Sequence, residues 1–312
     1  MRIILICKDM GGYVRTVADY LSSQGHHVLF LDTTRSAPPL QWLSGKLRKL
    51  LRTRLALWLD KRRISIFGQA DCLLVVNPGQ VDTSVITKAM RVSQVSKAYL
   101  YDSLARSPVS PQWLARFDQV FSFDRTDVAA HGLHKLYNFI YEAQPPARAN
   151  GSRPYKAFLV MAGVDRLALL DNIAGQLEQA GYPNYLFIVQ YKTAGTPKYN
   201  IRFTRERLGL QDVQAHIQDS DILIDLVRPK QTGVSFRLFE ALHYQRKVIT
   251  NNPSVRDYDF YNPNNILIID EAQPHIDPAF LRCDYQPVAP QLLRKYTLPG
   301  WCETVFGLSA ER

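Results

Sequence analysis

The sequence predicts an α/β protein made of two consecutive domains, each a doubly wound parallel sheet. Three observations carry this prediction. From residue 3 onward, short apolar runs alternate with segments of helical spacing. A polar segment rich in proline and glycine, 142–154, interrupts the alternation, which then restarts. Several of the short runs are apolar at every position, which is typical of parallel strands buried on both faces.

The first half begins as strand, glycine turn, helix and strand. Ile3–Cys7 is apolar throughout, Gly11 and Gly12 form the turn, and Val28–Leu31 is the second strand. This order predicts a right-handed βαβ crossover. Further strands are expected at 72–76, 98–101 and 119–123, with helices around 83–94 and 125–132.

The second half repeats the alternation without repeating the sequence. Its strands are expected at 157–161, 185–189, 222–226, 248–250 and 265–269, with helices at 167–180 and from about Val234. We therefore expect an N-terminal Rossmann-like domain at 1–147, a C-terminal one at 148–290, and closing helices at 291–312.

Composition limits the classes of partner and the compartment. The chain has 312 residues, enough for two ordinary domains, and a net charge of +10, which favours an anionic partner. Its four cysteines form no CxxC pair, so we expect buried, reduced thiols in a cytoplasmic protein. The N-terminus lacks the features of a secretory signal, and no window is apolar enough to span a bilayer.

Residues 40–63 depart from the alternation because they predict one long, basic amphipathic helix. Its apolar stripe consists of Leu43, Leu47, Leu50, Leu51, Leu55 and Trp58. Its cations lie on or beside the other face: Lys46, Lys49, Arg52, Arg62 and Arg63. Such a helix fits the surface of an anionic membrane. The alternative is an ordinary helix that packs its stripe on the sheet and leaves its basic face in water.

Ligands of open α/β sheets bind beyond the carboxyl ends of the strands, so candidate site residues are expected there. Gly11 and Gly12 follow the first strand, where they either let the backbone approach a ligand at a free helix N-terminus or make a simple turn. Asp102 follows strand 98–101 and is either a general base for a hydroxyl group or a helix N-cap.

Gly163 and Arg166 follow the first strand of the second half. The forked donors of an arginine suit a diphosphate, and Arg166 is either such a ligand or a surface arginine at a helix start. A cation at a helix N-terminus opposes the helix dipole, which favours the functional interpretation.

The stretch 231–252, QTGVSFRLFEALHYQRKVITNN, carries the most informative pattern. The loop before its helix combines cations with a glycine turn: Arg228, Lys230, Gln231, Thr232 and Gly233. At about 100° per residue, Arg237 and Glu240 fall on a different face from the core-facing leucines. They are either a plain helical salt pair, or part of a nucleoside diphosphate site with phosphates on the loop and ribose hydroxyls on the carboxylate.

Metal and nucleic-acid sites have little support in the sequence. The DxD triplets at 219–221 and 257–259 have the spacing of a divalent-ion site, but such short matches arise readily by chance. The seven histidines show no HxxxH or HExxH spacing. Cations are not interleaved with aromatic residues along one sheet face, so nucleic-acid binding is not expected.

Together these residues resemble the GT-B glycosyltransferases, in which two Rossmann-like domains face each other across a cleft that holds the active site. FEALHYQRKVITNN (239–252) is similar to the EAmA.GkPVIat region of their second half. YLYDSLARSP, RFDQVFSFDRTD and YDFYNPNNI resemble a bacterial subset associated with lipopolysaccharide, capsule and exopolysaccharide assembly. The resemblance extends from Ile3 to about Ile269.

Residue by residue, the resemblance implies that Glu240 binds the nucleotide ribose and that Thr232 and Gly233 contact the phosphates. It also implies that Arg166 neutralises the diphosphate and that Asp102 lies near the acceptor-side catalytic position. Retaining members carry a second glutamate eight positions before Glu240, where this chain has Thr232. The stereochemical outcome is therefore left open.

The sequence thus predicts a metal-independent glycosyltransferase that moves a sugar from a nucleotide sugar, a UDP-sugar, to a surface polysaccharide or lipid-linked glycan. No cofactor besides this co-substrate is expected. Arg228, Lys230 or Arg166 would offset charge on the leaving group, and Gly11 and Gly12 would form an acceptor-side loop. Residues 40–63 would place the protein on the inner face of the cytoplasmic membrane. The alternatives are a GT-B-like sugar-nucleotide epimerase and a non-catalytic scaffold of polysaccharide assembly.

Overall fold

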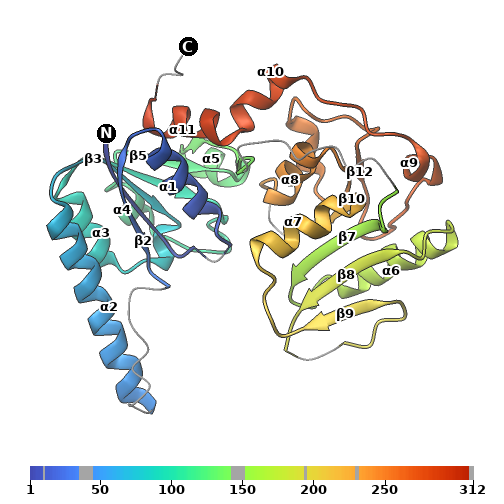
Figure 1. Cartoon of the computed structure of the whole chain (residues 1–312), viewed down its shortest axis with the longest axis horizontal. Coiled ribbons are helices and arrows are strands. Elements are labelled where there is room, and N and C mark those ends of the chain that lie inside the picture. Colours follow the sequence, from blue (N-terminus) through green and yellow to red (C-terminus); the bar gives the residue numbers. More distant parts are fainter. Residues whose placement is uncertain (10, 35–44, 142–151, 193–194, 229–231, 309–312) are drawn as a thin grey trace. The chain divides into compact units, whose positions relative to one another are not determined.

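The computed structural model describes residues 1–9, 11–34, 45–141, 152–192, 195–228 and 232–308. The chain divides into two compact units (Figure 1). The N-terminal unit comprises Met1–Tyr137 and Leu298–Arg312, and the C-terminal unit comprises Asn138–Thr297. Each unit contains one six-stranded sheet, and all strand pairs are parallel, which confirms the predicted fold class of two doubly wound α/β sheets.

The sheet of the N-terminal unit has the order β2-β1-β3-β4-β5-β6. Its strands are β1 (Arg2–Cys7), β2 (His27–Asp32), β3 (Ala70–Val76), β4 (Ser93–Leu100), β5 (Gln119–Ser122) and β6 (His134–Lys135). Because β2 and β3 lie on opposite sides of β1, the direction of winding reverses between β1 and β3. Such a switch point leaves a crevice at the carboxyl ends of the strands, where ligands of this fold class bind.

Helices cover both faces of this sheet. On one face α2 (Gly45–Phe67), α3 (Thr83–Met90) and α4 (Pro111–Leu114) share a buried apolar cluster with the strands. On the other face, α1 (Tyr13–Ser23) contacts α11 (Leu298–Phe306). The helix α11 is held by an edge-on contact between Trp301 and Tyr99 and by a 2.6 Å hydrogen bond from Lys97 Nζ to the carbonyl of Val305. The short elements η1 (Pro78–Gln80) and α5 (Arg125–His131) follow β3 and β5.

The sheet of the C-terminal unit has the order β12-β11-β10-β7-β8-β9. Its strands are β7 (Tyr155–Ala162), β8 (Tyr185–Gln190), β9 (Ile201–Thr204), β10 (Ser220–Asp225), β11 (Lys247–Thr250) and β12 (Ile266–Ile268). The chain runs outward from β7 to β9 and then returns to β10 on the other side of β7. The switch point of this unit therefore lies between β7 and β10.

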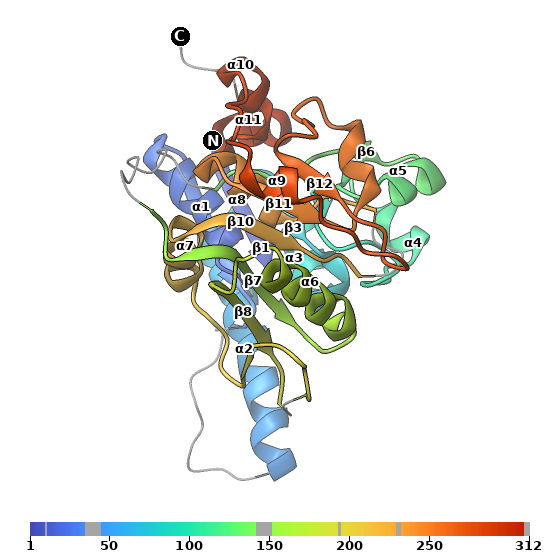
Figure 2. The same ribbon diagram turned by 90° about the vertical axis from the view of Figure 1, so that its right-hand side faces the viewer.

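Two pairs of helices enclose the second sheet. Alternate residues of its strands form one apolar cluster with α6 (Leu167–Gln179) and α9 (Pro278–Arg282). On the opposite face α7 (Leu210–Gln218) contacts α8 (Phe236–Tyr244), and Phe158 of β7 packs on His216 of α7. Figure 2 shows α6 and α7 on different sides of β7 and β8. The remaining elements are η2 (Pro253–Asp257), α10 (Pro290–Leu293) and η3 (Arg294–Tyr296).

The unit boundaries differ from the expected domain limits. The C-terminal unit begins at Asn138, before the expected position 148, because 138–141 bonds to and stacks on the α8 region. The chain returns to the N-terminal unit at Leu298, so the expected closing segment 291–312 divides between the two units. Most of the expected linker, 142–154, lies outside the described residues.

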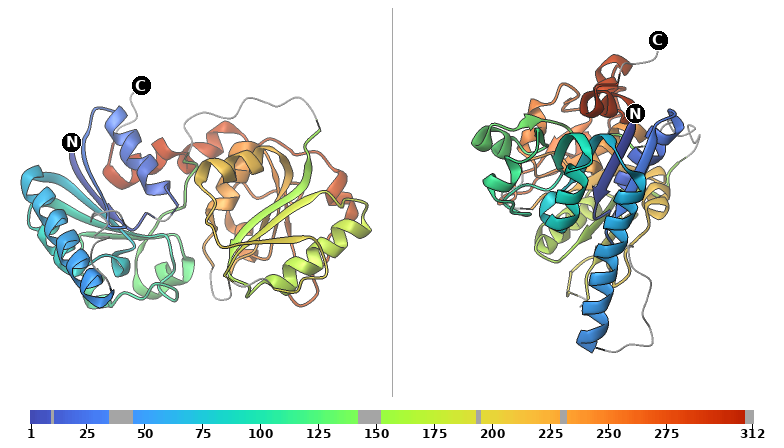
Figure 3. Two further views of the ribbon diagram at one scale, coloured as in Figure 1. Left: turned by 60° about the horizontal axis from the view of Figure 1, so that its bottom comes forward. Right: turned by 90° about the vertical axis from the view of Figure 1, so that its left-hand side faces the viewer.

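The long helix α2 orients its apolar stripe in an unexpected way. It spans Gly45–Phe67, whereas 40–44 of the expected helix lie outside the described residues. The stripe residues Leu50, Leu51 and Trp58 are 50%, 38% and 54% exposed, while Asp60 and Ile64 of another face are buried. These three stripe residues therefore do not pack on the sheet, whereas Leu55 is half-buried. In Figure 3 the first turns of α2 extend away from the rest of the N-terminal unit. Within the described ranges, no helix combines the length and apolarity needed to cross a bilayer.

Candidate functional site

Two arginines meet at the switch point of the C-terminal unit. Arg166 lies at the start of α6 and donates from Nη2 to the carbonyl of Ala162, at 2.9 Å, and from Nη1 to the carbonyl of Leu226. Arg228 donates to the same Ala162 carbonyl at 3.3 Å. Arg166 thereby ties the carboxyl end of β7 to that of β10 and holds the crevice between them in one geometry.

The two guanidinium groups share one carboxylate within ion-pair distance. The Asp165 carboxylate lies 3.4 Å from Arg166 Nε and 3.6 Å from Arg228 Nε, so one acid faces two guanidinium groups. The side chain of Arg166 is 12% exposed and that of Arg228 is 35% exposed. Burial lowers the pKa of Arg166 from its ordinary value, although a guanidinium stays charged at neutral pH. Arg228 is therefore the more accessible cation for an anionic ligand.

Gly163 permits the tight turn after β7. Its φ is +85°, and a Cβ there would lie 2.9 Å from Asp165 Oδ1. An L side chain in this conformation costs about 1–2 kcal/mol. We expect Gly163→Ala to lower the free energy of unfolding by about this amount and to displace Asp165 from the arginines. Urea unfolding checks the expectation, with Gly181→Ala (φ +83°, nothing within 4 Å of a Cβ) as the strain-only control. A loss for Gly163→Ala that is no larger than that for Gly181→Ala would contradict the crowding argument.

A buried carboxylate positions the start of α8. Asp225, the last residue of β10, accepts hydrogen bonds from Ser235 Oγ at 2.7 Å and Thr250 Oγ1 at 2.9 Å. Ser235 is the N-cap of α8 and also accepts from the backbone N–H of Arg237. Asp225 therefore joins β10, β11 and the N-terminus of α8 in one hydrogen-bonded unit.

Burial raises the pKa of Asp225, and the two hydroxyl donors oppose that effect only in part. At pH values above the ordinary pKa of an aspartic acid, Asp225 in the folded chain retains a proton that it has lost in the unfolded chain. The stability of the folded state therefore falls as pH rises. Asparagine does not titrate. We therefore expect the free energy of unfolding of the wild type, minus that of Asp225→Asn, to decrease as the pH rises above about 4. Urea unfolding across this range tests the sign, and an increase would refute the assignment.

Three asparagines fix the loops around this edge. Asn252 Nδ2 donates to the carbonyl of Gly233 at 3.1 Å, and Asn138 Nδ2 donates to that of Val234 at 3.0 Å. Asn251 bonds both to the N–H and to the carbonyl of Val227. The sequence analysis did not assign these side chains. For Asn251 and Asn252 the signal was the pair NN directly after strand 247–250, at the edge where site loops gather, whereas Asn138 carried no such signal.

The helix α8 begins later and is more deeply buried than expected. It starts at Phe236, because the extended Ser235 caps it, and Val234 precedes it. Arg237 and Glu240 form an ion pair, with Arg237 Nη1 2.6 Å from Glu240 Oε2, and the nucleotide role of the two residues stays a prediction. The expectation of a face turned away from the core is wrong for Glu240, whose side chain is 1% exposed. Tyr141 covers it and donates its hydroxyl to Glu240 Oε1 at 2.8 Å.

A hollow of about 360 Å³ lies beside the first turn of α6. Its walls come from the β7 loop, from α6 and from the segment after β12: Asp165, Arg166, Ala168, Leu169, Asn172, Glu271, Ala272 and Pro274. The open space therefore adjoins Arg166, whereas Arg228 is not among its lining residues. Gln231 and Lys230 lie outside the described residues, whereas Thr232 is half-buried and Gly233 is buried.

In the N-terminal unit, Asp102 follows β4 and is anchored by several donors. Its Oδ2 accepts from Asn77 Nδ2 at 3.1 Å and from Gln80 Nε2 at 3.4 Å, and its Oδ1 lies 2.9 Å from Arg106 Nη1. It does not cap a helix in the described residues. These contacts hold the carboxylate in place at the carboxyl edge of the sheet.

The glycine turn after β1 differs from the expectation of a free helix N-terminus. Gly12 has φ +83° and precedes α1. The carboxylate of Asp9 accepts from the N–H groups of Gly12 and Arg15, each at 2.9 Å. The chain thus supplies its own anion at this helix end, and burial raises the pKa of Asp9. An acceptor-side role of Gly11 and Gly12 stays a prediction.

Neither DxD triplet forms a cluster of acids. Asp221 faces Arg153 at 2.9 Å and Lys156 at 3.4 Å. Asp259 pairs with Lys295 at 2.6 Å and accepts from the Tyr296 hydroxyl. No group of three or more potential metal ligands occurs among the residues that the structure describes.

Comparison with solved structures identifies the fold as that of the GT-B glycosyltransferases. A UDP-forming α,α-trehalose-phosphate synthase from Burkholderia xenovorans, in complex with glucose-6-phosphate, has a TM-score of 0.56 at 11% identity, covering 98% of this chain and 99% of its own. The enzyme of the same name from Burkholderia vietnamiensis has a TM-score of 0.54 at 12% identity, and the match covers 98% of this chain and 99% of that enzyme. An α-glucosyltransferase in complex with UDP-glucose and DNA gives 0.54 at 12%, covering 87% of each chain. No protein-family model and no curated protein matches the sequence.

Proposed function

We propose that this chain is a glycosyltransferase that takes its sugar from a nucleotide-sugar donor, with the donor's diphosphate bound at the switch point of the C-terminal unit. One observation carries the proposal: two guanidinium groups converge on the end of β7 against a single carboxylate. Anionic ligands of doubly wound sheets bind at such a switch point, near helix N-termini.

Each part of this site has a distinct role in the proposal. Arg228 donates to the diphosphate and offsets the charge that develops on it as the sugar leaves. Arg166 acts as a positioning residue, because its donors already hold the strand ends. The loop of Thr232 and Gly233, held by Asn252 and the cap of α8, gives the phosphates a fixed backbone.

The ribose is assigned to Glu240. A carboxylate accepts hydrogen bonds from two neighbouring hydroxyls, as a ribose requires. Since Tyr141 covers Glu240, the ribose would take the place of the tyrosine hydroxyl. The cations supply the charge that a metal ion would otherwise provide, so the proposed reaction is metal-independent and needs no cofactor besides the donor. UDP is the proposed nucleotide, because the names of the similar structures include UDP-forming and UDP-glucose-bound enzymes.

On the acceptor side, Asp102 is the proposed general base. For this role a hydroxyl of the acceptor must replace one of its present donors, Asn77, Gln80 or Arg106. The proposed acceptor is a growing surface polysaccharide or a lipid-linked glycan of a bacterium, consistent with the sequence resemblance. The cytoplasmic face of the membrane is the place where such an acceptor would meet the donor.

The outer face of α2 supports contact with an anionic membrane. Exposed Leu51 and Trp58 share this face with the cations Arg54 and Arg62, the combination found in interfacial helices. We expect Leu51→Glu to weaken binding to phosphatidylglycerol vesicles about tenfold, because it removes apolar burial and adds repulsion. Leu292→Glu is the matched control, since Leu292 is 40% exposed and Leu51 is 38% exposed. An equal loss of vesicle binding in both variants, or no loss in either, would contradict membrane contact through α2.

A thermal-shift panel of nucleoside diphosphates and sugar nucleotides tests the proposed function. A nucleotide-sugar enzyme is stabilised by several degrees at saturating ligand. A scaffold shows no shift with any of them. Prolonged incubation of the stabilising sugar nucleotide with the protein alone separates the remaining classes, because an epimerase converts the sugar without an acceptor and a transferase does not.

A further inference from the structure

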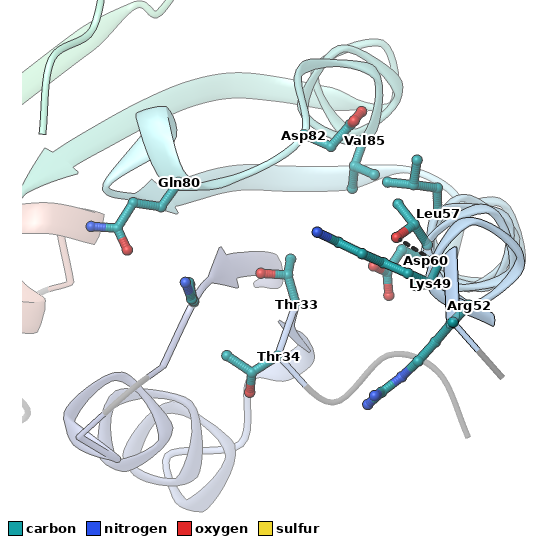
Figure 4. A pocket seen from close by; sticks show the side chains of 13 residues that line it. Thr33, Thr34, Lys49, Arg52, Leu57, Asp60, Gln80, Asp82 and Val85 are labelled. Atoms are coloured by element: carbon teal, nitrogen blue, oxygen red, sulfur yellow. Dashed lines mark hydrogen bonds between the residues drawn. The ribbon is translucent and has the colours of Figure 1, made fainter. Parts of the chain in front are cut away.

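A second pocket belongs entirely to the N-terminal unit, and the donor site does not account for it. Its volume is about 690 Å³, and it opens at the carboxyl ends of β1, β2 and β3, the switch point of that sheet (Figure 4). The strand-end loops contribute Lys8, Thr33, Thr34 and Gln80. One face of α2 forms the opposite wall, and Asp82 and Val85 of the α3 region complete it.

Three cations line this pocket: Lys8, Lys49 and Arg52. Figure 4 shows Lys49 extending from α2 across the pocket toward Thr33. Within the described part of the chain, none of the three charged groups forms an ion pair or a side-chain hydrogen bond. Cations that form no ion pair around a concave space attract an anion, and ammonium and guanidinium groups suit phosphate oxygens.

The geometry of α2 places the pocket cations on a different face from the exposed residues that are proposed to contact a membrane. At about 100° per residue, Lys49 and Arg52 lie within about 60° of each other, on the face shared with Ala56 and Asp60. Arg54 and Arg62 lie on the side of Trp58, each about 140° from Lys49, and neither lines the pocket. The cations of the pocket and those of the outer face are therefore distinct sets.

The pocket also presents hydrogen-bond acceptors. Asp60 is buried at its lining, and Asp82 accepts from the N–H of Ser84 at 2.9 Å, which caps α3. Thr33 and Thr34 add hydroxyl oxygens whose protons already go to the carbonyl of Cys7 and to Asp32. Acceptors beside cations suit a ligand that carries hydroxyl groups as well as phosphate, whereas inorganic phosphate alone would leave the acceptors unused.

We infer that this pocket binds a phosphate-bearing polyol, with the phosphate at Lys49 and Arg52 and the hydroxyls toward Asp60 and Asp82. The inference is independent of the nucleotide site. Two sources share this chemistry, a free sugar phosphate and a glycerophospho-type lipid headgroup. Both are available as soluble compounds, so binding can be measured without a membrane.

Calorimetric titration of the full chain tests the inference with two probes, glucose 6-phosphate and the deacylated headgroup glycerophosphoglycerol. Glucose and glycerol are the phosphate-free controls. We expect at least one phosphorylated probe to bind, and to lose about tenfold or more in affinity in Lys49→Gln/Arg52→Gln, because two charge-assisted contacts disappear. The charge-matched control Arg54→Gln/Arg62→Gln should retain the wild-type affinity. Which probe binds more tightly distinguishes a sugar phosphate from a lipid headgroup.

Three results would overturn the inference: neither phosphorylated probe binds, glucose binds as well as glucose 6-phosphate, or the control variant loses as much affinity as the pocket variant. A parallel titration with UDP keeps this outcome separate from that of the donor site. If the wild-type protein binds glucose 6-phosphate but not UDP, only the proposed donor site is refuted. If it binds UDP but neither phosphorylated probe, only the proposed pocket is refuted.

Discussion

Replacement of Glu240 by alanine is expected to lower the free energy of unfolding by about 3–5 kcal/mol, because it removes one partner of a buried ion pair. The side chain of Glu240 is 1% exposed and that of Arg237 is 13% exposed, so water cannot readily replace the lost carboxylate. The hydroxyl of Tyr141 loses its acceptor as well. Urea unfolding of the two proteins measures the difference.

A double-mutant cycle with Arg237→Ala provides the control. Since the two residues are in contact, the double variant should lose clearly less stability than the sum of the single variants. The same account predicts that Glu240→Ala weakens nucleotide binding at temperatures where the variant is folded. Additive stabilities would refute the ion pair, and unchanged affinity for every sugar nucleotide would refute the ribose assignment.

Replacement of Arg228 by glutamine is expected to lower the affinity for UDP about tenfold or more, since a charge-assisted contact contributes about 1.5–3 kcal/mol. Its effect on stability should be small, because the side chain is 35% exposed and lies 3.6 Å from Asp165. Calorimetric titration with UDP measures the affinity, and thermal unfolding checks the fold.

Arg202→Gln is the matched control for this experiment. Arg202 is an exposed arginine on β9, the edge strand two positions from β7 in the same sheet. The Arg202→Gln substitution makes the same change in net charge and leaves the switch point unaltered. A loss of UDP affinity as large in Arg202→Gln as in Arg228→Gln would show that net charge, and not the site at β7, governs binding.

Much of the fold follows from local pattern. Ten of the strands stand near their predicted positions, because runs such as Ile3–Cys7 and the apolar strand 222–226 are buried on both faces and leave a continuous signal. Two edge strands, β6 and β9, were not predicted. β6 has only two residues and both are exposed, and β9 (IRFT) has four residues that alternate apolar and polar, so neither carries the apolar run of a central strand.

The location of the candidate site was predictable from the sequence, but the contacts between its side chains were not. Gly163, Arg166, Arg228 and Gly233 follow strand ends, and the sheet topology brings that edge together. The contacts between them depend on residues far apart in sequence. Tyr141, which covers Glu240, is 99 residues away from it. Side-chain periodicity within α8 could not reveal this partner, and it therefore placed Glu240 on a face turned away from the core.

Polar side chains also changed the expected roles of glycine turns and helices. Asp9 occupies the N-terminal end of α1 behind the turn at Gly11 and Gly12, since a charged residue within the turn satisfies its N–H groups. Leu50, Leu51 and Trp58 of the α2 stripe point to water because the helix packs through Asp60 and Ile64. An apolar stripe alone does not state which surface covers it.

Amide hydrogen exchange with and without saturating UDP is the most direct test of the central claim, that the β7–β10 edge of the C-terminal unit binds the nucleotide. Ligand binding slows exchange in the segments that it contacts and stabilises. The account predicts protection in the turn after β7, in the first turn of α6, and at 232–237. Protection confined to the N-terminal unit, or no protection with any nucleoside diphosphate, would contradict it.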